Sequence, residues 1–123
     1  MEKVKFIICD DDAEIVKQLT DYIERLCREI GTLYTISSYT DGELFISHYK
    51  EKADIIFMDV EMPIMSGMEA AELLRQTDKG VTLVFTTSFE KYAIKGYSVN
   101  AYRYKIVAKT HRLDCGMKAT FFI

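Results

Sequence analysis

The stretch VKFIICDDDAEIVKQLTDYIERLCREI, residues 4–30, decides the fold of this chain. Residues 4–9 are apolar but for one lysine, which predicts a strand that is buried on both faces. Residues 13–30 carry apolar side chains at steps of three and four, the period of an amphipathic helix whose apolar face is expected to include Ile15, Leu19, Tyr22, Ile23, Leu26 and Ile30. Gly31 follows as a typical helix stop signal. A strand followed directly by an amphipathic helix is the repeating unit of a parallel α/β sheet.

Three adjacent aspartates, Asp10, Asp11 and Asp12, separate this strand from this helix. Adjacent carboxylates repel one another, so their clustering needs a reason. Asp12 is the expected cap of the helix, where an acidic residue also suits the helix dipole. Asp10 and Asp11 either share that capping role or hold a positively charged partner.

The alternation of strands and helices continues along the whole chain. It predicts right-handed crossovers and a doubly wound, five-stranded parallel sheet of the flavodoxin-like type, with helices on both faces. The further strands are expected at 33–39, 54–59, 81–87 and 101–107. The further helices are expected at 42–50 after Asp41, at 67–77 after Ser66, at 89–98, and at 113–121 near the end, where Gly116 opposes a helix.

The bulk composition fits one domain that spans residues 1–123. A net charge of −3 argues against direct nucleic-acid binding by this chain, because phosphate backbones require a basic face. No segment has the character of a membrane span or a signal peptide. Three widely spaced cysteines, Cys9, Cys27 and Cys115, are expected to be reduced thiols of a cytoplasmic protein, with Cys9 in the core.

Ligand sites of doubly wound folds lie beyond the carboxyl ends of the strands. The residues expected at that edge are Asp10 and Asp11 after the first strand, Asp59 at the end of the third, and hydroxyl residues after the fourth. Carboxylates without histidine or cysteine suit a hard cation, Mg²⁺ or alternatively Mn²⁺. A carboxylate held beside such a cation can act as a nucleophile on phosphorus.

Some polar residues have simpler explanations. Thr86 is expected to be an ordinary β-branched strand residue. His48 and His111 have no partner acids at ligand spacing, so we assign them no chemical role.

Four stretches carry a resemblance to a known family: CDDD (9–12), FMDVEMPIMSGME (57–69), FTTS (85–88) and NAYRY (100–104). With them the chain, up to about Val107, resembles the receiver domain of a bacterial two-component response regulator. Within that family it looks most like the LytTR-type branch, whose receivers precede a DNA-binding output domain.

The resemblance implies a role for each matching acid. Asp59 corresponds to the aspartate that accepts a phosphoryl group from a histidine kinase. Asp10 and Asp11 correspond to the acidic pair that binds Mg²⁺ together with Asp59. Glu61 corresponds to the position whose backbone carbonyl binds the metal.

The resemblance also implies a switch. Thr87 corresponds to the hydroxyl residue that contacts the phosphoryl group and moves on activation, and Tyr104 to the aromatic switch position; as an ordinary core aromatic Tyr104 is equally well explained. Pro63 and Gly67, with Met62, correspond to the structural loop after the acceptor. Phosphorylation would then change the face made by the fourth helix, fifth strand and last helix, a possible homodimer surface. The output domain that controls transcription is expected to be absent from these residues.

The sequence departs from the family at the end of the fifth strand. The family places Lys-Pro where this chain has Val107 and Ala108. Lys109, which is expected to lie past the strand end, is the favoured phosphate contact, and Lys105 is the alternative. The tail after Lys109 is also unlike the family's last helix; it is either natural and divergent, or truncated or altered.

The sequence also bears on two rival functions. The chain is not expected to be an enzyme beyond slow self-dephosphorylation, because a magnesium-dependent phosphatase with an aspartate nucleophile would carry a second Asp where Glu61 stands. The alternative supported by Val107 and Ala108 is a degenerate receiver, a protein-binding module that is never phosphorylated.

Overall fold

The computed structural model describes residues 3–50, 52–87, 104–109 and 117–122; of Thr87 and the last two ranges only the backbone is described. The helix expected at 89–98 lies outside these residues, as do His111 and Cys115.

The strands form one sheet in the order β2-β1-β3-β4-β5-β6. Neighbours from β2 through β5 pair in parallel, and β6 pairs with β5 in the antiparallel sense. The order of the parallel strands is that of the flavodoxin-like doubly wound fold, so the expected fold class is confirmed. The strands are β1 (Val4–Cys9), β2 (Tyr34–Tyr39), β3 (Ile55–Asp59), β4 (Thr82–Thr87), β5 (Tyr104–Lys109) and β6 (Met117–Phe122).

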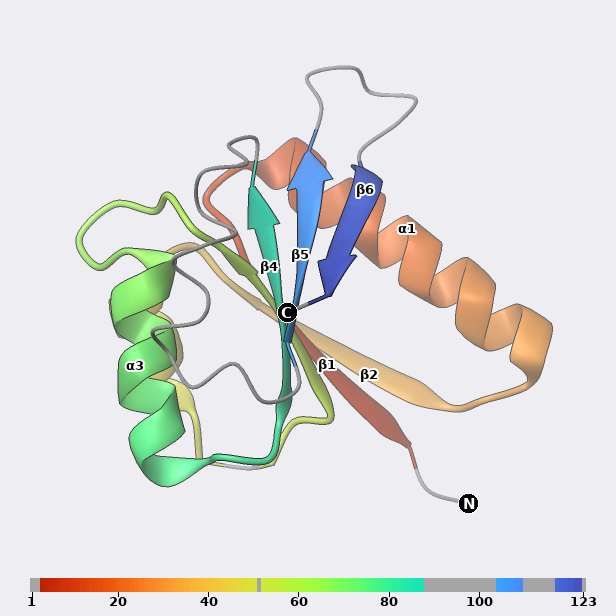
Figure 1. Ribbon diagram of the computed structural model, residues 1–123. Coiled ribbons are helices and arrows are strands. Elements are labelled where there is room, and N and C mark those ends of the chain that lie inside the picture. Colours follow the sequence, from red (N-terminus) through yellow and green to blue (C-terminus); the bar gives the residue numbers. More distant parts are fainter. Residues whose placement is uncertain (1–2, 51, 88–103, 110–116, 123) are drawn as a thin grey trace.

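Three described helices cover the two faces of this sheet, with α1 on one side and α3 on the other (Figure 1). They are α1 (Ala13–Ile30), α2 (Gly42–His48) and α3 (Gly67–Thr77). Each begins at its expected cap, because the side chains of Asp12, Asp41 and Ser66 accept hydrogen bonds from backbone N–H groups of the first turn. Among the helices of the described residues, none is both long and apolar enough to cross a membrane.

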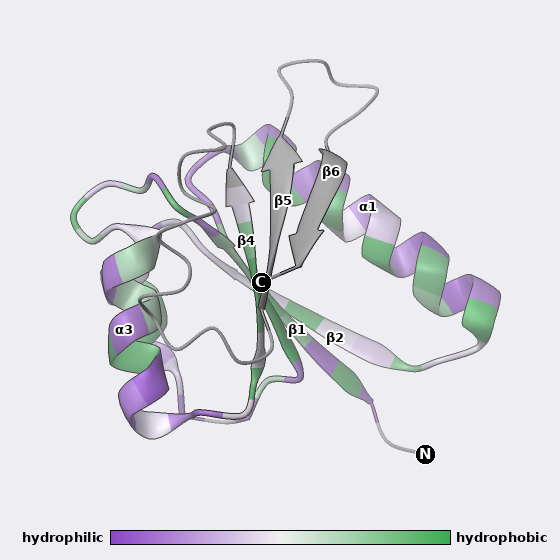
Figure 2. Ribbon diagram, in the orientation of Figure 1, coloured by the Kyte–Doolittle hydropathy of each residue, from purple (hydrophilic) through white to green (hydrophobic). Residues whose placement is uncertain are grey.

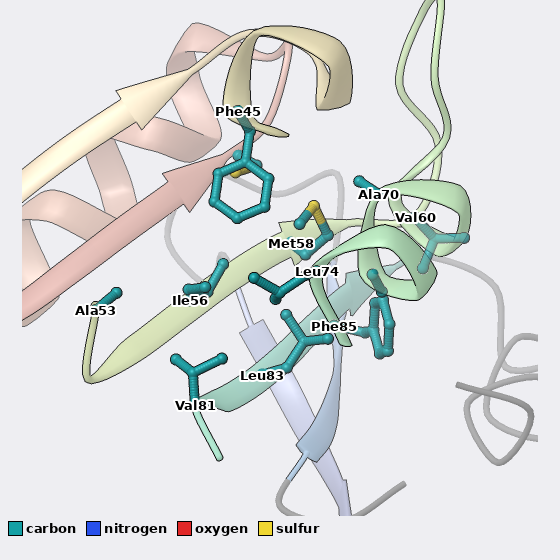
Figure 3. Close-up of a cluster of buried hydrophobic side chains, with 12 residues drawn as sticks. Phe45, Ala53, Ile56, Met58, Val60, Ala70, Leu74, Val81, Leu83 and Phe85 are labelled. Carbon is teal, nitrogen blue, oxygen red and sulfur yellow. The ribbon is translucent and has the colours of Figure 1, made fainter. Parts of the chain in front are cut away.

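The main hydrophobic core lies between the sheet and the helices α2 and α3. In Figure 3, Phe45 and Leu74 meet side chains of β3 and β4 such as Ile56, Met58 and Phe85. Cys9 is fully buried in the same cluster, as expected. The central strands are predominantly hydrophobic in Figure 2, as strands covered on both faces must be.

The opposite face of the sheet is covered by α1, whose contact is narrower than its sequence predicts. Leu19, Ile23 and Cys27 are buried against Phe6 and Ile8. Three other apolar residues of the helix that were expected to share this face are instead exposed: Tyr22, Leu26 and Ile30. The prediction of an amphipathic helix is therefore correct, but the buried face of the helix is centred on Leu19, Ile23 and Cys27 and does not include all of its apolar residues.

The end of the chain departs from expectation in two ways. The fifth strand is described over Tyr104–Lys109 and so extends beyond the expected end at residue 107; Lys109 is its last residue and does not lie past its end. The segment 117–122, which was expected to lie in a last helix, forms β6 against β5. Its run Thr120-Phe121-Phe122 is β-branched and aromatic, which favours a strand, and the helix-disfavouring Gly116 precedes it.

Two glycines allow backbone segments to approach more closely than any other residue would permit. A Cβ atom at Gly67 would lie 2.0 Å from the carbonyl oxygen of Asp59. A Cβ atom at Gly42 would lie 2.9 Å from the carbonyl oxygen of Met65. The first contact seats the start of α3 directly on the end of β3, and the second seats α2 on the loop between them.

A partly buried hydrogen-bond network ties the end of α2 to the turn before β4. The Tyr49 hydroxyl donates to Asp78 Oδ2 over 2.7 Å and accepts from the N–H of Ala53 over 3.1 Å. Arg75 donates through Nη1 to the carbonyl of Val81 over 2.8 Å. Burial raises the pKa of Tyr49 to about 12. Burial opposes ionisation of Asp78, but hydrogen bonds from Tyr49 and from two backbone N–H groups outweigh it and lower the pKa of Asp78.

We predict that Gly67→Ala lowers the free energy of unfolding by about 3 kcal/mol or more, because the new methyl group would overlap the Asp59 backbone. Gly80→Ala is the matched control, since a Cβ atom at Gly80 would meet no atom of the described residues within 4 Å. Chemical denaturation measures both variants. Equal stabilities would show that the close approach at Gly67 is not needed.

We predict that Tyr49→Phe lowers the free energy of unfolding by about 1–2 kcal/mol at neutral pH, because the Ala53 N–H loses its acceptor and Asp78 loses a donor. The pKa of Asp78 is lower in the folded chain than its ordinary value of 3.8, so the ionised form stabilises the fold at neutral pH and that contribution disappears as the pH falls through the folded pKa. The difference between the variant and wild type should shrink over that range. Tyr22→Phe, at an exposed tyrosine, is the control for urea denaturation at each pH; a difference that does not depend on pH would contradict the role of Asp78.

Candidate metal centre

Three aspartates from two neighbouring strands meet at the carboxyl edge of the sheet. Strands β1 and β3 pair in parallel with Cys9 opposite Met58, so the residues that follow them reach the same level. One carboxylate oxygen each from Asp10, Asp11 and Asp59 lies within 4.8 Å of the others. Asp10 and Asp59 are buried, with 2% and 5% of their surface exposed, whereas Asp11 is exposed. The juxtaposition expected from the sequence is therefore present.

Backbone hydrogen bonds hold the two buried carboxylates in place. The N–H of Asp12 donates to Oδ1 of Asp10 over 2.9 Å, and the N–H of Glu61 donates to Oδ1 of Asp59 over 3.3 Å. The N–H of Asp10 in turn donates to the carbonyl of Tyr39 over 3.1 Å, which ties the end of β1 to the end of β2. The positions of these side chains thus follow from the backbone around them.

The chemistry of this cluster fits a hard divalent cation. Two buried carboxylates and a third beside them repel one another in a region of low dielectric, and a cation would offset that repulsion. The cluster offers oxygen atoms alone, which is the donor set of Mg²⁺ and Mn²⁺. Asp11 is exposed, so this side of the cluster faces solvent.

The loop from β3 to α3 is shaped by its backbone. The N–H of Gly67 donates to the carbonyl of Val60 over 2.9 Å, and the N–H of Met65 donates to the carbonyl of Pro63 over 2.7 Å. Between these contacts Ile64 adopts φ 69°, a left-handed conformation that is strained for a β-branched residue, and 77% of its surface is exposed. Pro63 and Gly67 therefore do lie in a tightly bonded loop directly after Asp59.

The remaining expected site residues lie along β4 and β5. Asp59 is level with Thr86, whose side chain is buried and whose carbonyl accepts from the N–H of Val60 over 3.3 Å, as a strand residue should. Thr87 ends β4 opposite Ala108, so its backbone reaches the acidic edge. The side chains of Thr87, Tyr104 and both lysines lie outside the described part of the chain.

The backbone register separates the two candidate lysines. Lys109 ends β5 one step beyond Ala108, which is level with Thr87. Lys105 stands opposite Val84 in the middle of β4, about 13 Å further back along the strand. The register therefore places the backbone of Lys109, and not that of Lys105, near the carboxyl edge of the sheet, although Lys109 lies within β5 and not past its end.

Other polar residues near the site have structural roles. Asp12 caps α1, as expected, by accepting from the N–H of Glu14 over 2.9 Å. The His48 ring contacts the carbonyl of Leu44 over 2.9 Å at the end of α2 and lies outside the acidic cluster. Sequence reasoning missed the contribution of Gly42, whose only signal is a glycine directly after a capping aspartate.

A family model described as the response regulator receiver domain matches residues 6–119. Among curated relatives, the sensory transduction protein LytT of Enterococcus faecalis is 39% identical over 98 residues, which are 80% of this chain and 40% of the relative. The protein of the same name from Oceanobacillus iheyensis is 26% identical over 105 residues, 83% of this chain and 41% of the relative. The likeness to LytTR-type regulators is thus confirmed, and the chain spans about two fifths of the length of these relatives.

Solved structures share the fold. The chemotaxis protein CheY4 of Vibrio cholerae has a TM-score of 0.74 and 19% identity, with 92% of each chain covered. The response regulator TrrA of Thermotoga maritima, solved in complex with Mg(2+)-BeF, has a TM-score of 0.73 and 23% identity, with 90% of each chain covered. Because the family match begins in β1 and extends into β6, this chain belongs to the family of response regulator receiver domains.

Proposed function

We propose that this chain is a phosphorylation-controlled switch in which Asp59 accepts a phosphoryl group from the phosphohistidine of a histidine kinase. The observation that carries the proposal is the buried Asp59 carboxylate, which lies with oxygen atoms of Asp10 and Asp11 within 4.8 Å at an edge where phosphate can enter. Membership of the receiver family supports the same role, because receiver domains act in two-component signalling.

The transfer can be written in terms of the residues at this edge. An oxygen of the Asp59 carboxylate attacks phosphorus, the new O–P bond forms, and the P–N bond to the kinase imidazole breaks. The leaving nitrogen keeps the electron pair and takes a proton from solvent. The hydrogen bond from the Glu61 N–H to Oδ1 of Asp59 helps to orient the carboxylate for this attack.

Asp10 and Asp11, with Asp59 and the backbone carbonyl of Glu61, are the proposed ligands of Mg²⁺, with Mn²⁺ as a substitute. When bound, such a cation supplies positive charge that offsets the carboxylates and the phosphoryl oxygens. Asp11 is the exposed ligand, so it is the one best placed to exchange with water.

We further propose that Thr87 and Lys109, with Lys105 as the alternative, contact the phosphoryl oxygens. A shift of Thr87 followed by Tyr104 would then change the surface beyond β4 and β5 and favour a homodimer. From the likeness to LytTR-type regulators we also propose that a DNA-binding output domain in the same regulator controls transcription in the cytoplasm; the chain spans about two fifths of the curated relatives.

A second candidate is a degenerate receiver that binds a partner without phosphorylation. The observation that favours it is the pair Val107 and Ala108 where the family carries Lys-Pro. Slow self-dephosphorylation is compatible with the first proposal, whereas Glu61 argues against a magnesium-dependent phosphatase, which would carry its second aspartate at that position.

We predict that a small phosphodonor with Mg²⁺ adds one phosphoryl group to wild type and none to Asp59→Asn, as measured by intact-protein mass. Asp21→Asn, at an exposed position on α1, is the matched control and should be modified like wild type. An adduct on Asp59→Asn would place the acceptor elsewhere. No adduct on folded wild type would favour the degenerate receiver.

We predict that Asp11→Asn weakens Mg²⁺ binding by about tenfold or more, because a charged ligand is lost. Asp12→Asn is the matched control: it removes the same charge from the neighbouring residue, and asparagine caps a helix as well as aspartate does. Its effect should stay within about threefold, since Asp12 is exposed and screened. Isothermal titration calorimetry measures both, and equal losses would contradict the role of Asp11 as a ligand.

A further inference from the structure

A concave site lies on the α2 side of the sheet, over the edge formed by β1 and β2. It is a cavity of about 430 Å³, within the range of small-molecule sites. Its floor includes Thr35 and Ser37 of β2, which stand level with Lys5 and Ile7 of β1. None of the three acidic residues of the metal centre lines it.

The cavity exists because the helix above it is short. α2 has seven residues and ends at His48, so it covers one end of this sheet edge and leaves the other open. Thr35 and Ser37 are small, polar and exposed, where a covered face would carry large apolar side chains. The hollow therefore follows from local sequence.

Positive charge gathers around this hollow although the whole chain carries a net charge of −3. Lys5, Lys50 and Lys52 line it, and within the described part of the chain no aspartate or glutamate is among its lining residues. Two described carboxylates contact lining residues without lining the cavity themselves: Asp54 accepts a hydrogen bond from the Lys5 backbone N–H over 2.8 Å, and Asp78 accepts one from the Tyr49 hydroxyl over 2.7 Å. The cavity thus suits an anion.

One wall of the cavity is aromatic and fixed. The rings of Tyr39 and His48 lie 5.9 Å apart at an interplanar angle of 31°. The Tyr49 hydroxyl is held by two partners, Asp78 Oδ2 and the Ala53 N–H. A preformed aromatic wall favours a planar ring in the ligand, because little ordering is needed on binding.

We propose that this cavity binds a small organic phosphate that carries a planar ring, the chemical class of a mononucleotide. The phosphate group is bound by Lys50 and Lys52 at the rim and by the hydroxyls of Thr35 and Ser37 on the floor, and the ring lies against the aromatic wall of Tyr39 and Tyr49. The proposal does not depend on phosphorylation of Asp59, because the two sites share no lining residue.

The test is titration of the wild-type chain with adenosine monophosphate in the presence of a chelator, which keeps divalent cations from the acidic edge. Amide shifts in two-dimensional NMR should map to residues 35–39 and 48–53, and adenosine or inorganic phosphate alone should bind at least about tenfold more weakly. Shifts confined to the acidic edge, or no binding, would overturn the proposal. Equal binding of inorganic phosphate would reduce the cavity to a simple anion site and overturn the assignment of a ring-bearing ligand.

Two variants make the test sharp. Ser37→Tyr fills the floor, whereas Ser38→Tyr is the matched control, because adjacent strand residues point to opposite faces. Ser37→Tyr and the double variant Lys50→Gln/Lys52→Gln should each weaken adenosine monophosphate binding by about tenfold or more, with Ser38→Tyr and Asp59→Asn unchanged. Thermal unfolding confirms that each variant is folded. Equal effects of Ser37→Tyr and Ser38→Tyr would contradict the cavity as the binding site.

Discussion

The parallel pairing of β1 with β3 is the constraint on which the rest of the structure depends. Both strands are central and carry fully buried side chains, and their register brings the residues after Cys9 level with the end of β3. The same pairing therefore forms the core and gathers the acids. The repulsion among those acids is tolerated because it falls at an edge where backbone N–H groups and a cation can approach. The apolar middles of these strands thus stabilise the fold, and the polar residues at their ends form the acidic site.

The loop between β3 and α3 connects the acidic edge to the surface of the protein. Gly67 packs against the Asp59 carbonyl and Gly42 packs against the Met65 carbonyl. The starts of α3 and α2 are therefore both positioned by the backbone between β3 and α3. Between them the strained Ile64 is exposed. A displacement of the Asp59 backbone would therefore act directly on the backbone of Gly67, because no side chain lies between the two.

Much of this fold could be predicted from sequence, and the reasons are physical. The strands β1 and β3 are short apolar runs with polar ends, and α1 and α3 begin at capping side chains that act over two or three residues. The meeting of Asp10, Asp11 and Asp59 followed from the rule that parallel strands end at one edge. The rest depended on tertiary context: which apolar residues of α1 are covered, whether 117–122 pairs with β5, and where a short α2 leaves a hollow. Residues four apart lie on one side of a helix whether that side is buried or exposed. The prediction that Tyr22, Leu26 and Ile30 are buried was therefore wrong.

The cysteine that precedes the acidic pair has a consequence for the kind of signal this domain can carry. Cys9 is fully buried, and burial, with the nearby charges of Asp10 and Asp41, raises the pKa of its thiol. A thiol that stays protonated is a poor target for peroxide and for disulfide exchange. Cys27 is buried as well, on the face of α1 that packs against the sheet. Burial therefore protects both thiols from oxidants, so the acidic edge is not coupled to the redox state of its surroundings through these two positions.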